Sequence, residues 1–284
     1  MPSVPEDVLI VGRNSYIGGY LSQYAIRRGL KVTSIGSADC NFLNPEEVNE
    51  FFSKRAQQPH TVVFLAVINK SVENSFDSYR ANVSIVRSLI DGCRGGDIRS
   101  ILYFSSVDVY GRRPRLPITE QSSVAPDTWY GLGKYSCEWM LRSSGEVGCP
   151  VTVLRLPGVY GRWDGDRSVI GRMIATLQKE GRIVVRGSGR HLRDYVYVDD
   201  VARLVEALIS LKYDGVLNVA TGVSRSVLET ARLIGRALDA QFEIVHEAAD
   251  EDREFDLAFD NQTLRALLPE FQFTDPEVGI RTYR

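Results

Sequence analysis

Two side chains four residues apart, Tyr130 and Lys134, are the best candidates in this sequence for moving a proton. On a helix, residues at this spacing lie one turn apart on the same face. An ammonium group beside a phenol lowers the pKa of the phenol, which can then act as an acid or base toward a substrate hydroxyl. Because such a pair also arises by chance in many helices, its assignment depends on the residues around it.

A glycine-rich turn near the N-terminus is a second candidate site. The apolar run Val8-Leu9-Ile10-Val11 leads into Gly12-Arg13-Asn14-Ser15-Tyr16-Ile17-Gly18. A turn of this kind at the start of a helix lets the backbone approach a pyrophosphate, whose charge meets free N–H groups and the helix dipole. The string predicts a dinucleotide site, although an ordinary strand–turn–helix would explain it about as well.

The choice between NAD and NADP depends on the end of the second strand. This strand ends at Ile35-Gly36-Ser37, without the acidic residue that binds a ribose 2′-hydroxyl. Arg13 could face a 2′-phosphate or be an ordinary solvated arginine, and Asp39 lies nearby in the sequence. On balance these residues slightly favour NADP over NAD.

Apolar runs alternate with helical periods along the first half of the chain, and this alternation predicts an α/β fold with a doubly wound parallel sheet. The expected strands cover residues 8–11, 31–35, 61–66, 100–105 and 151–156. The expected helices cover residues 17–28, 79–93 and 130–143, with another starting at Asn44-Pro45. After Pro157 the pattern becomes loop-rich. We therefore expect a dinucleotide-binding domain over 1–157, to which 193–222 returns, and a smaller C-terminal substrate-binding lobe over 158–284.

Four strings in this order carry a resemblance to a known family: Ser105-Ser106-Val107-Asp108-Val109-Tyr110-Gly111, Tyr130-Gly-Leu-Gly-Lys134, Arg155-Leu-Pro-Gly-Val-Tyr160-Gly161 and Arg193-Asp194-Tyr195-Val196-Tyr197-Val198-Asp199-Asp200-Val201-Ala202. The chain closely resembles the extended short-chain dehydrogenase/reductase family, which comprises nucleotide-sugar epimerases, dehydratases and reductases. The resemblance implies a Rossmann-like fold and an NAD(P)-dependent isomerase or oxidoreductase that acts on a nucleotide sugar.

The resemblance also implies roles for matching residues. Tyr130 would be the catalytic acid/base, Lys134 would bind the nicotinamide ribose and tune Tyr130, and Ser106 would hydrogen-bond the reacting oxygen. Arg193 would bind the substrate diphosphate with Arg253 as a second contact, and Gly158 replaces an asparagine that often touches that diphosphate. The implied cofactor-binding residues are Gly12, Arg13, Ser15, Tyr16, Ile17, Gly18, Ser37, Asn41, Phe42, Leu65, Ala66, Asn82, Tyr130 and Lys134. Among these, Asn82 would support the backbone of the active site, and Asn41-Phe42 takes the place of a pair that contacts adenine.

The shared chemistry of the family is hydride transfer at a sugar carbon, here expected to be C4. The 4,6-dehydratases need two carboxyl groups directly after the catalytic Ser or Thr, whereas this chain has Val107 and Asp108, so dehydration is disfavoured. Asp108 could act as an acid/base or could only hydrogen-bond within its loop. An epimerase and an NADPH-dependent 4-keto-sugar reductase both stay open. A non-catalytic NAD(P) sensor is disfavoured because Tyr130 and Lys134 are both present.

Composition sets further bounds. Of the 284 residues 44% are apolar and 25% charged, and the net charge is -2, so neither nucleic acid nor a membrane surface is an expected partner. The four cysteines lack CxxC spacing and the three histidines are isolated, which predicts no metal site. The first apolar run is too short for a signal peptide, so we expect a cytoplasmic protein. The family commonly forms homodimers through two helices, and the candidate contacts here are Val83, Val86, Leu89, Ile90, Met140 and Leu141, each of which could instead face the monomer's own sheet.

Overall fold

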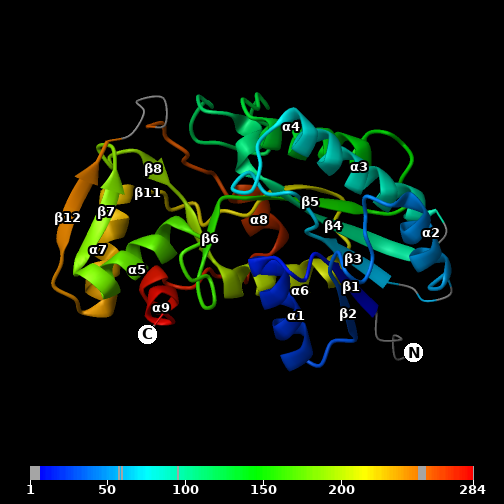
Figure 1. Ribbon diagram of the computed structural model, residues 1–284, viewed down its shortest axis with the longest axis horizontal. Coiled ribbons are helices and arrows are strands. Elements are labelled where there is room, and N and C mark those ends of the chain that lie inside the picture. The colour runs from blue at the N-terminus through cyan, green and yellow to red at the C-terminus, as the bar shows by residue number, and fades with distance from the viewer. Residues whose placement is uncertain (1–6, 57, 59, 95, 249–253, 284) are drawn as a thin grey trace. The chain divides into compact units, whose positions relative to one another are not determined.

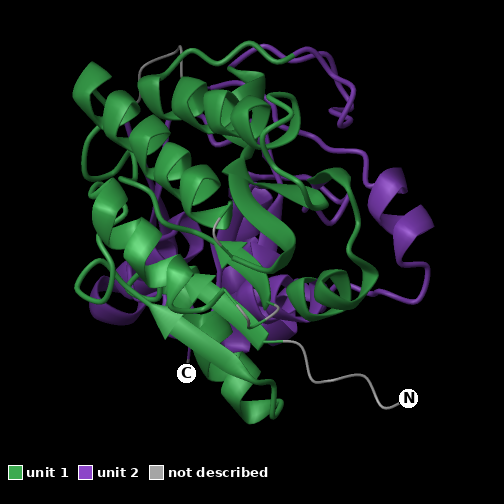
Figure 2. Ribbon diagram, turned by 90° about the vertical axis from the view of Figure 1, so that its right-hand side faces the viewer, with its two compact units in different colours: residues 1–111, 124–155, 205–217 green, residues 112–123, 156–204, 218–284 purple. Residues whose placement is uncertain are grey.

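The computed structural model describes residues 7–56, 58, 60–94, 96–248 and 254–283. It divides the chain into two compact units, shown in two colours in Figure 2. The first unit contains Met1–Gly111, Val124–Arg155 and Val205–Leu217. The second contains Arg112–Ser123, Leu156–Leu204 and Asn218–Arg284. The sequence predicts that 193–222 returns to the first domain, and the structure includes 205–217 of that segment in the first unit.

A parallel sheet forms the centre of the first unit. Its strands are β1 (Asp7–Val11), β2 (Val32–Ile35), β3 (His60–Phe64), β4 (Ile98–Ser106), β5 (Val151–Leu156) and β10 (Gly215–Asn218). They lie in the order β10-β5-β4-β3-β1-β2, and β1 pairs in parallel with both β2 and β3, as β3 does with β4. This confirms the predicted Rossmann-like, doubly wound sheet. Because neighbouring strands are parallel, the ends of β1, β3 and β4 meet at one edge, where such folds bind ligands.

Helices cover both faces of this sheet (Figure 1). α1 (Tyr16–Arg27) lies on one face, and α2 (Pro45–Ser53), α3 (Phe76–Cys93) and α4 (Trp129–Arg142) lie on the other. The predicted boundaries hold to within three residues. The largest shift is at α3, which begins at Phe76 instead of Tyr79 because Ser75 and Ser78 form a capping box.

The apolar stripe of α3 faces the core of the first unit. Every residue of β3 is buried, and Val86, Leu89 and Ile90 of α3 pack into the same core. Leu141 of α4 is buried there too. These residues recur at helical spacing because they cover the sheet. Of the two alternatives for these four side chains, the structure therefore supports packing against the monomer's own sheet, and they supply no dimer contact.

The second unit consists of short paired strands and helices. Its strands are β6 (Gly158–Tyr160), β7 (Arg182–Arg186), β8 (Leu192–Arg193), β9 (Tyr195–Tyr197), β11 (Arg225–Ser226) and β12 (Glu243–Glu247). They pair as β6 with β9, β7 with β12 and β8 with β11. Its helices are α5 (Val169–Glu180), α7 (Val227–Leu238), α8 (Gln262–Leu267) and α9 (Pro276–Arg281), while α6 (Val198–Leu211) contains residues of both units. Across the described residues, no helix has the length and apolar character needed to cross a membrane.

Candidate active site

The predicted tyrosine–lysine pair lies on the buried face of α4. Thr128 caps this helix by accepting a hydrogen bond from the Gly131 N–H at 3.0 Å, and Asn74 Oδ1 accepts one from the Tyr130 N–H at 3.0 Å. Tyr130 is 8% exposed and Lys134 4% exposed. The Lys134 ammonium donates to the Phe104 carbonyl at 2.6 Å and lies 5.7 Å from the centroid of the Tyr130 ring. The helical spacing therefore brings the two side chains together as predicted.

Burial dominates the titration of both groups. It lowers the pKa of Lys134 to about 8, against the opposing effect of nearby negative charges that include Glu138 and Asp108. The ammonium form of Lys134 therefore still predominates at neutral pH. Burial raises the pKa of Tyr130, the Asp108 carboxylate raises it further, and a hydrogen bond with Ser106 lowers it. In the protein alone Tyr130 is thus a protonated phenol and a proton donor.

Ser106 and Asp108 lie where β4 ends and the short 3₁₀ helix η1 (Val107–Tyr110) begins. The Ser106 hydroxyl accepts a hydrogen bond from the Asp108 N–H at 3.2 Å and also contacts Tyr130. The Asp108 carboxylate forms an ion pair with Lys70, a residue that sequence reasoning missed. Lys70 belongs to no motif and lies 38 residues before Asp108 in the chain, so only the fold brings the two together.

A buried ion pair beneath the site was also missed. Glu138 and Arg155 are each 5% exposed, and Arg155 Nη2 lies 2.7 Å from Glu138 Oε2. Arg155 Nη1 also donates to the Tyr110 hydroxyl at 2.9 Å, and the Ser105 hydroxyl donates to Glu138. The pair therefore joins α4, β4, β5 and η1 next to the catalytic candidates. Its sequence signal is the position of Glu138, one helical turn after Lys134.

The glycine turn has the close backbone packing that a dinucleotide cradle requires. Gly12 has φ +107°, and a Cβ atom there would lie 3.0 Å from backbone atoms of Leu65 and Ala66. A Cβ atom on Gly18 would lie 2.2 Å from the Gly12 carbonyl oxygen. Side chains are therefore excluded at both positions, as in the tight backbone turns that hold a pyrophosphate.

Ser15 caps α1, although it replaces a glycine of the family pattern. Its hydroxyl donates to the Gly12 carbonyl at 2.8 Å and accepts from the Gly18 N–H at 3.0 Å. Tyr16 and Ile17 form the first turn of α1, where backbone N–H groups lack helical partners. This N-terminus fits the phosphate groups of NAD(P).

Asn82 holds the loop that follows β3. Its side chain accepts a hydrogen bond from the Ile68 N–H at 2.7 Å and donates one to the Ile68 carbonyl at 3.1 Å. Leu65 and Ala66 lie at the start of this loop against Gly12. The contact agrees with the supporting role that the family resemblance implies for Asn82.

The turn after β2 places an acid beside Arg13. The Arg13 guanidinium lies 2.8 Å from Asp39 Oδ2 and also donates to the Ser34 carbonyl at 2.9 Å. Asp39 in turn accepts a hydrogen bond from the Gly36 N–H at 2.8 Å. Arg13 is thus already paired in the structure with the acid that the sequence analysis noted close by.

The remaining predicted adenine-side residues differ in exposure. Ser37 and Asn41 are exposed, and Asn41 Oδ1 accepts a hydrogen bond from the Leu43 N–H at 3.0 Å. Phe42 is 5% exposed and packs edge-on against Phe64, with ring centroids 5.3 Å apart. The Phe42 ring therefore belongs to the core, and its contact with adenine stays a prediction.

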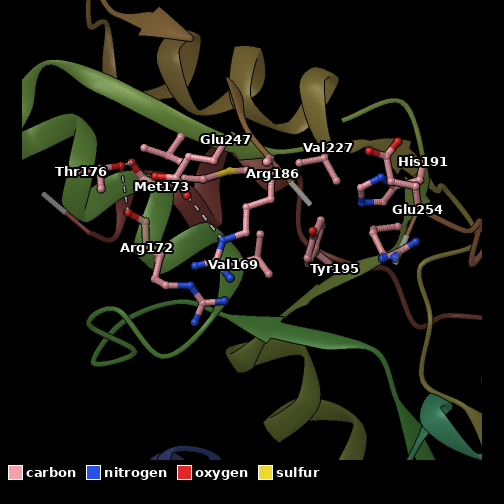
Figure 3. Close-up of a pocket in the computed structure, with 13 residues that line it drawn as sticks. Val169, Arg172, Met173, Thr176, Arg186, His191, Tyr195, Val227, Glu247 and Glu254 are labelled. Atoms are coloured by element: carbon pink, nitrogen blue, oxygen red, sulfur yellow. Dashed lines mark hydrogen bonds and ion pairs between the residues drawn. The ribbon is translucent and has the colours of Figure 1, made fainter. Parts of the chain in front are cut away.

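The second unit contains a cavity of about 760 Å³ (Figure 3). It is lined by Val169, Arg172, Met173, Thr176, Val184, Arg186, His191, Arg193, Tyr195, Val227, Glu247, Ala248 and Glu254. Glu247 lies 3.7 Å from Arg186, and Glu254 accepts hydrogen bonds from Ser188. Among the described lining residues, three arginines stand against two glutamates.

Arg193 is one of the residues that line the cavity. Its guanidinium donates to the carbonyls of Leu192 and Phe255 and lies 4.8 Å from the centroid of the Phe255 ring. These contacts hold the guanidinium in one orientation at the wall of the cavity. Arg253, the second predicted diphosphate contact, lies outside the described residues.

Comparison with known proteins decides the family. A model of the NAD dependent epimerase/dehydratase family matches residues 8–220, which is most of the chain. The chain belongs to this family. The resemblance in the four sequence strings is thereby confirmed, and the protein is an enzyme of the nucleotide-sugar epimerase and dehydratase group.

Relatives in this family cover nearly the whole chain. A putative UDP-glucose 4-epimerase of Methanocaldococcus jannaschii is 26% identical over 280 residues, covering 92% of each chain. The UDP-N-acetylglucosamine 4-epimerase of Methanobrevibacter ruminantium M1, solved with UDP-N-acetylmuramic acid, has 23% identity and a TM-score of 0.84, covering 98% of this chain and 96% of that one. The UDP-glucose 4-epimerase of Thermus thermophilus, solved with NAD, has 22% identity and a TM-score of 0.83, covering 97% of both. At these identities the two solved structures establish the fold.

One departure from the epimerase/dehydratase pattern has a structural explanation. Gly158 replaces an asparagine, and a Cβ atom at this position would lie 2.7 Å from the ring of Tyr195. β6 pairs directly with β9, so Gly158 lies opposite Tyr195. The tyrosine ring occupies the space that the missing side chain would fill.

Proposed function

We propose that this enzyme is an NAD-dependent 4-epimerase of a nucleotide sugar, with Tyr130 as its acid/base. The observation that carries the proposal is the convergence of Tyr130, Lys134 and Ser106 at the edge of the sheet where the glycine turn also lies. The curated relative from Methanocaldococcus jannaschii, named a putative UDP-glucose 4-epimerase, supports a UDP-sugar as substrate.

The side chains divide the chemistry between them. A bound NAD would supply the hydride acceptor for the sugar C4 and a positive ring that favours the phenolate. Tyr130 takes the proton of the C4 hydroxyl and later returns it, so the phenol must alternate between its two protonation states. Ser106 holds the reacting oxygen in line with Tyr130. Lys134 binds the nicotinamide ribose and favours the phenolate through its charge.

The cavity of the second unit is our proposed site for the nucleoside diphosphate. Arg172, Arg186 and Arg193 provide charged donors that suit phosphate oxygens. His191 also lines the cavity, and its Nδ1 atom is buried without a hydrogen-bond partner among the described residues. Burial lowers the pKa of His191, so the imidazole is neutral at pH 7 and available to a neutral polar group of the nucleotide.

The pairing of Arg13 with Asp39 leads us to propose NAD as the cofactor. Asp39, in the turn that follows β2, can accept from a ribose 2′-hydroxyl and would repel a 2′-phosphate. Arg13 is neutralised by the same carboxylate, which removes the reason for expecting NADP. An epimerase regenerates NAD within each catalytic cycle, whereas a 4-keto-sugar reductase would consume NADPH, so a preference for NAD favours the epimerase over the reductase.

We further propose that the enzyme forms a homodimer through α3 and α4. Aromatic side chains are exposed on these helices, namely Phe76 (52%), Trp129 (41%), Tyr135 (37%) and Trp139 (56%). Phe76 packs edge-on against Trp129 with ring centroids 5.3 Å apart, so part of this surface is already ordered. Aromatic residues are enriched at the centres of protein interfaces.

The function is tested by incubating the purified enzyme with NAD and UDP-glucose or UDP-N-acetylglucosamine and following the C4 epimer by NMR. Tyr130→Phe should lower turnover by about 10²–10⁴-fold while NAD binding persists. Tyr135→Phe makes the same chemical change on the exposed side of α4 and should leave turnover unchanged. Full activity of Tyr130→Phe would refute the assignment. Oxidation of NADPH with a 4-keto sugar, without epimerisation, would identify a reductase instead.

A further inference from the structure

A second ammonium group, that of Lys70, lies beside Tyr130. Lys70 is in the loop after β3, and its Nζ atom forms an ion pair with the Asp108 carboxylate. The same Nζ atom lies 5.6 Å from the centroid of the Tyr130 ring, and Lys134 Nζ lies 5.7 Å from it. Tyr130 therefore has two ammonium groups and one carboxylate as close neighbours.

The ion pair of Lys70 and Asp108 is held in place from several directions. Asn82 fixes the loop that carries Lys70 through both of its hydrogen bonds to Ile68. The backbone N–H of Asp108 donates to the Ser106 hydroxyl, which fixes the start of η1. The Asp108 side chain is 24% exposed and that of Lys70 is 49% exposed, so solvent weakens their field without removing it.

Among the described residues of the first unit, the titratable groups that face Tyr130 come from four elements. They are Lys70 in the loop after β3, Tyr103 on β4, Asp108 on η1 and Lys134 on α4. Asp108 raises the pKa of Tyr130 because a negative charge disfavours a phenolate. Lys70 carries the opposite charge and forms an ion pair with that carboxylate.

We propose that Lys70 is a positioning residue of the active site, whose ammonium compensates the Asp108 charge at Tyr130 and so sets the pH range over which Tyr130 exchanges protons. The inference rests on the proposed role of Tyr130 as acid/base. Asp108, the possible acid/base of the sequence analysis, acts in this assignment through its charge and its contact with Lys70. The two residues form a unit that sequence spacing does not reveal.

The titration of Tyr130 can be measured without any substrate. The enzyme is produced with 3-fluorotyrosine, and the ¹⁹F resonance of Tyr130 is assigned by its loss in Tyr130→Phe. With NAD bound, Lys70→Met should raise the titration midpoint of this resonance by about half to one pH unit, and Asp108→Asn should lower it by a similar amount. The double variant should titrate close to the wild type, and Lys70→Arg should preserve the wild-type midpoint.

Lys54→Met is the matched control, because it also removes a surface ion pair, that with Glu50 on α2. It should leave the Tyr130 midpoint unchanged. An unchanged midpoint in Lys70→Met, or a Tyr130 resonance that titrates in no variant, would overturn the proposal. This readout is independent of epimerase activity, so inactive wild-type enzyme would refute the proposed function without affecting the titration.

Turnover supplies a second readout when the proposed function holds. Lys70→Met should lower kcat about three- to tenfold at neutral pH, and the kcat of the variant should approach the wild-type value as the pH rises. The reason is that a Tyr130 phenol with a raised titration midpoint loses its proton only at higher pH. A loss of equal size at every pH would show that Lys70 only supports the fold or binds substrate.

Discussion

Replacing Glu138 by glutamine removes the charge that compensates Arg155 inside the first unit. Both side chains are 5% exposed, and the guanidinium donates to both carboxylate oxygens as well as to Tyr110. Breaking a buried ion pair at one partner costs about 3–5 kcal/mol, because the other charge stays buried. Glutamine keeps the shape of the side chain and one hydrogen-bond acceptor, so we expect the free energy of unfolding to fall by about 3 kcal/mol. For a chain of this size, each kcal/mol of lost stability lowers Tm by about 2 °C, so we expect Tm to fall by roughly 6 °C.

Calorimetry of three variants tests this reasoning. Arg87→Met is the surface control, since it removes contacts with Asp91 and Glu146 whose side chains are 31% and 32% exposed, and it should cost less than about 1 kcal/mol. The double variant Glu138→Met with Arg155→Met removes both buried charges and should be more stable than Glu138→Gln. The argument is refuted if Glu138→Gln loses no more stability than Arg87→Met, or if the double variant is the least stable of the three.

Three further predictions concern ligands and assembly. Arg193→Ala should weaken UDP-sugar binding by about 2–4 kcal/mol while NAD affinity stays nearly constant in calorimetric titrations; equal losses for both ligands would mean that Arg193 is only structural. Asp39→Asn should shift the ratio of NADPH to NADH affinity by about tenfold toward NADPH, because it frees Arg13 and removes a carboxylate; dinucleotide fluorescence measures the ratio, and no shift would contradict the proposed choice of NAD. Trp139→Glu should convert the proposed dimer into monomers in sedimentation velocity, since the exposed indole is replaced by a charge; a wild type that is already monomeric at micromolar concentration would exclude the dimer.

Much of the first unit was predictable because its signals are local. The continuous apolar run of β3 predicts a strand buried on both faces, and Asn44 followed by Pro45 predicts the start of α2, where Asn44 Oδ1 does accept from the Glu46 N–H. Each of these patterns depends on residues that are neighbours in the chain. The division between the two units was harder to predict, because a segment such as 112–123 belongs to the second unit through contacts with residues distant in the sequence, for example that of Ile118 with Phe259.

The sequence by itself determined that Tyr130 and Lys134 lie together on one face of α4, since a four-residue spacing on a helix is enough to place both there. It also determined the glycine turn, because Gly12 and Gly18 mark positions where a Cβ atom would clash. The tertiary structure alone decided which charges meet around that pair. Lys70 reaches Asp108, and Arg13 reaches Asp39, only because parallel strands bring their carboxyl ends to one edge, where loops distant in sequence become neighbours.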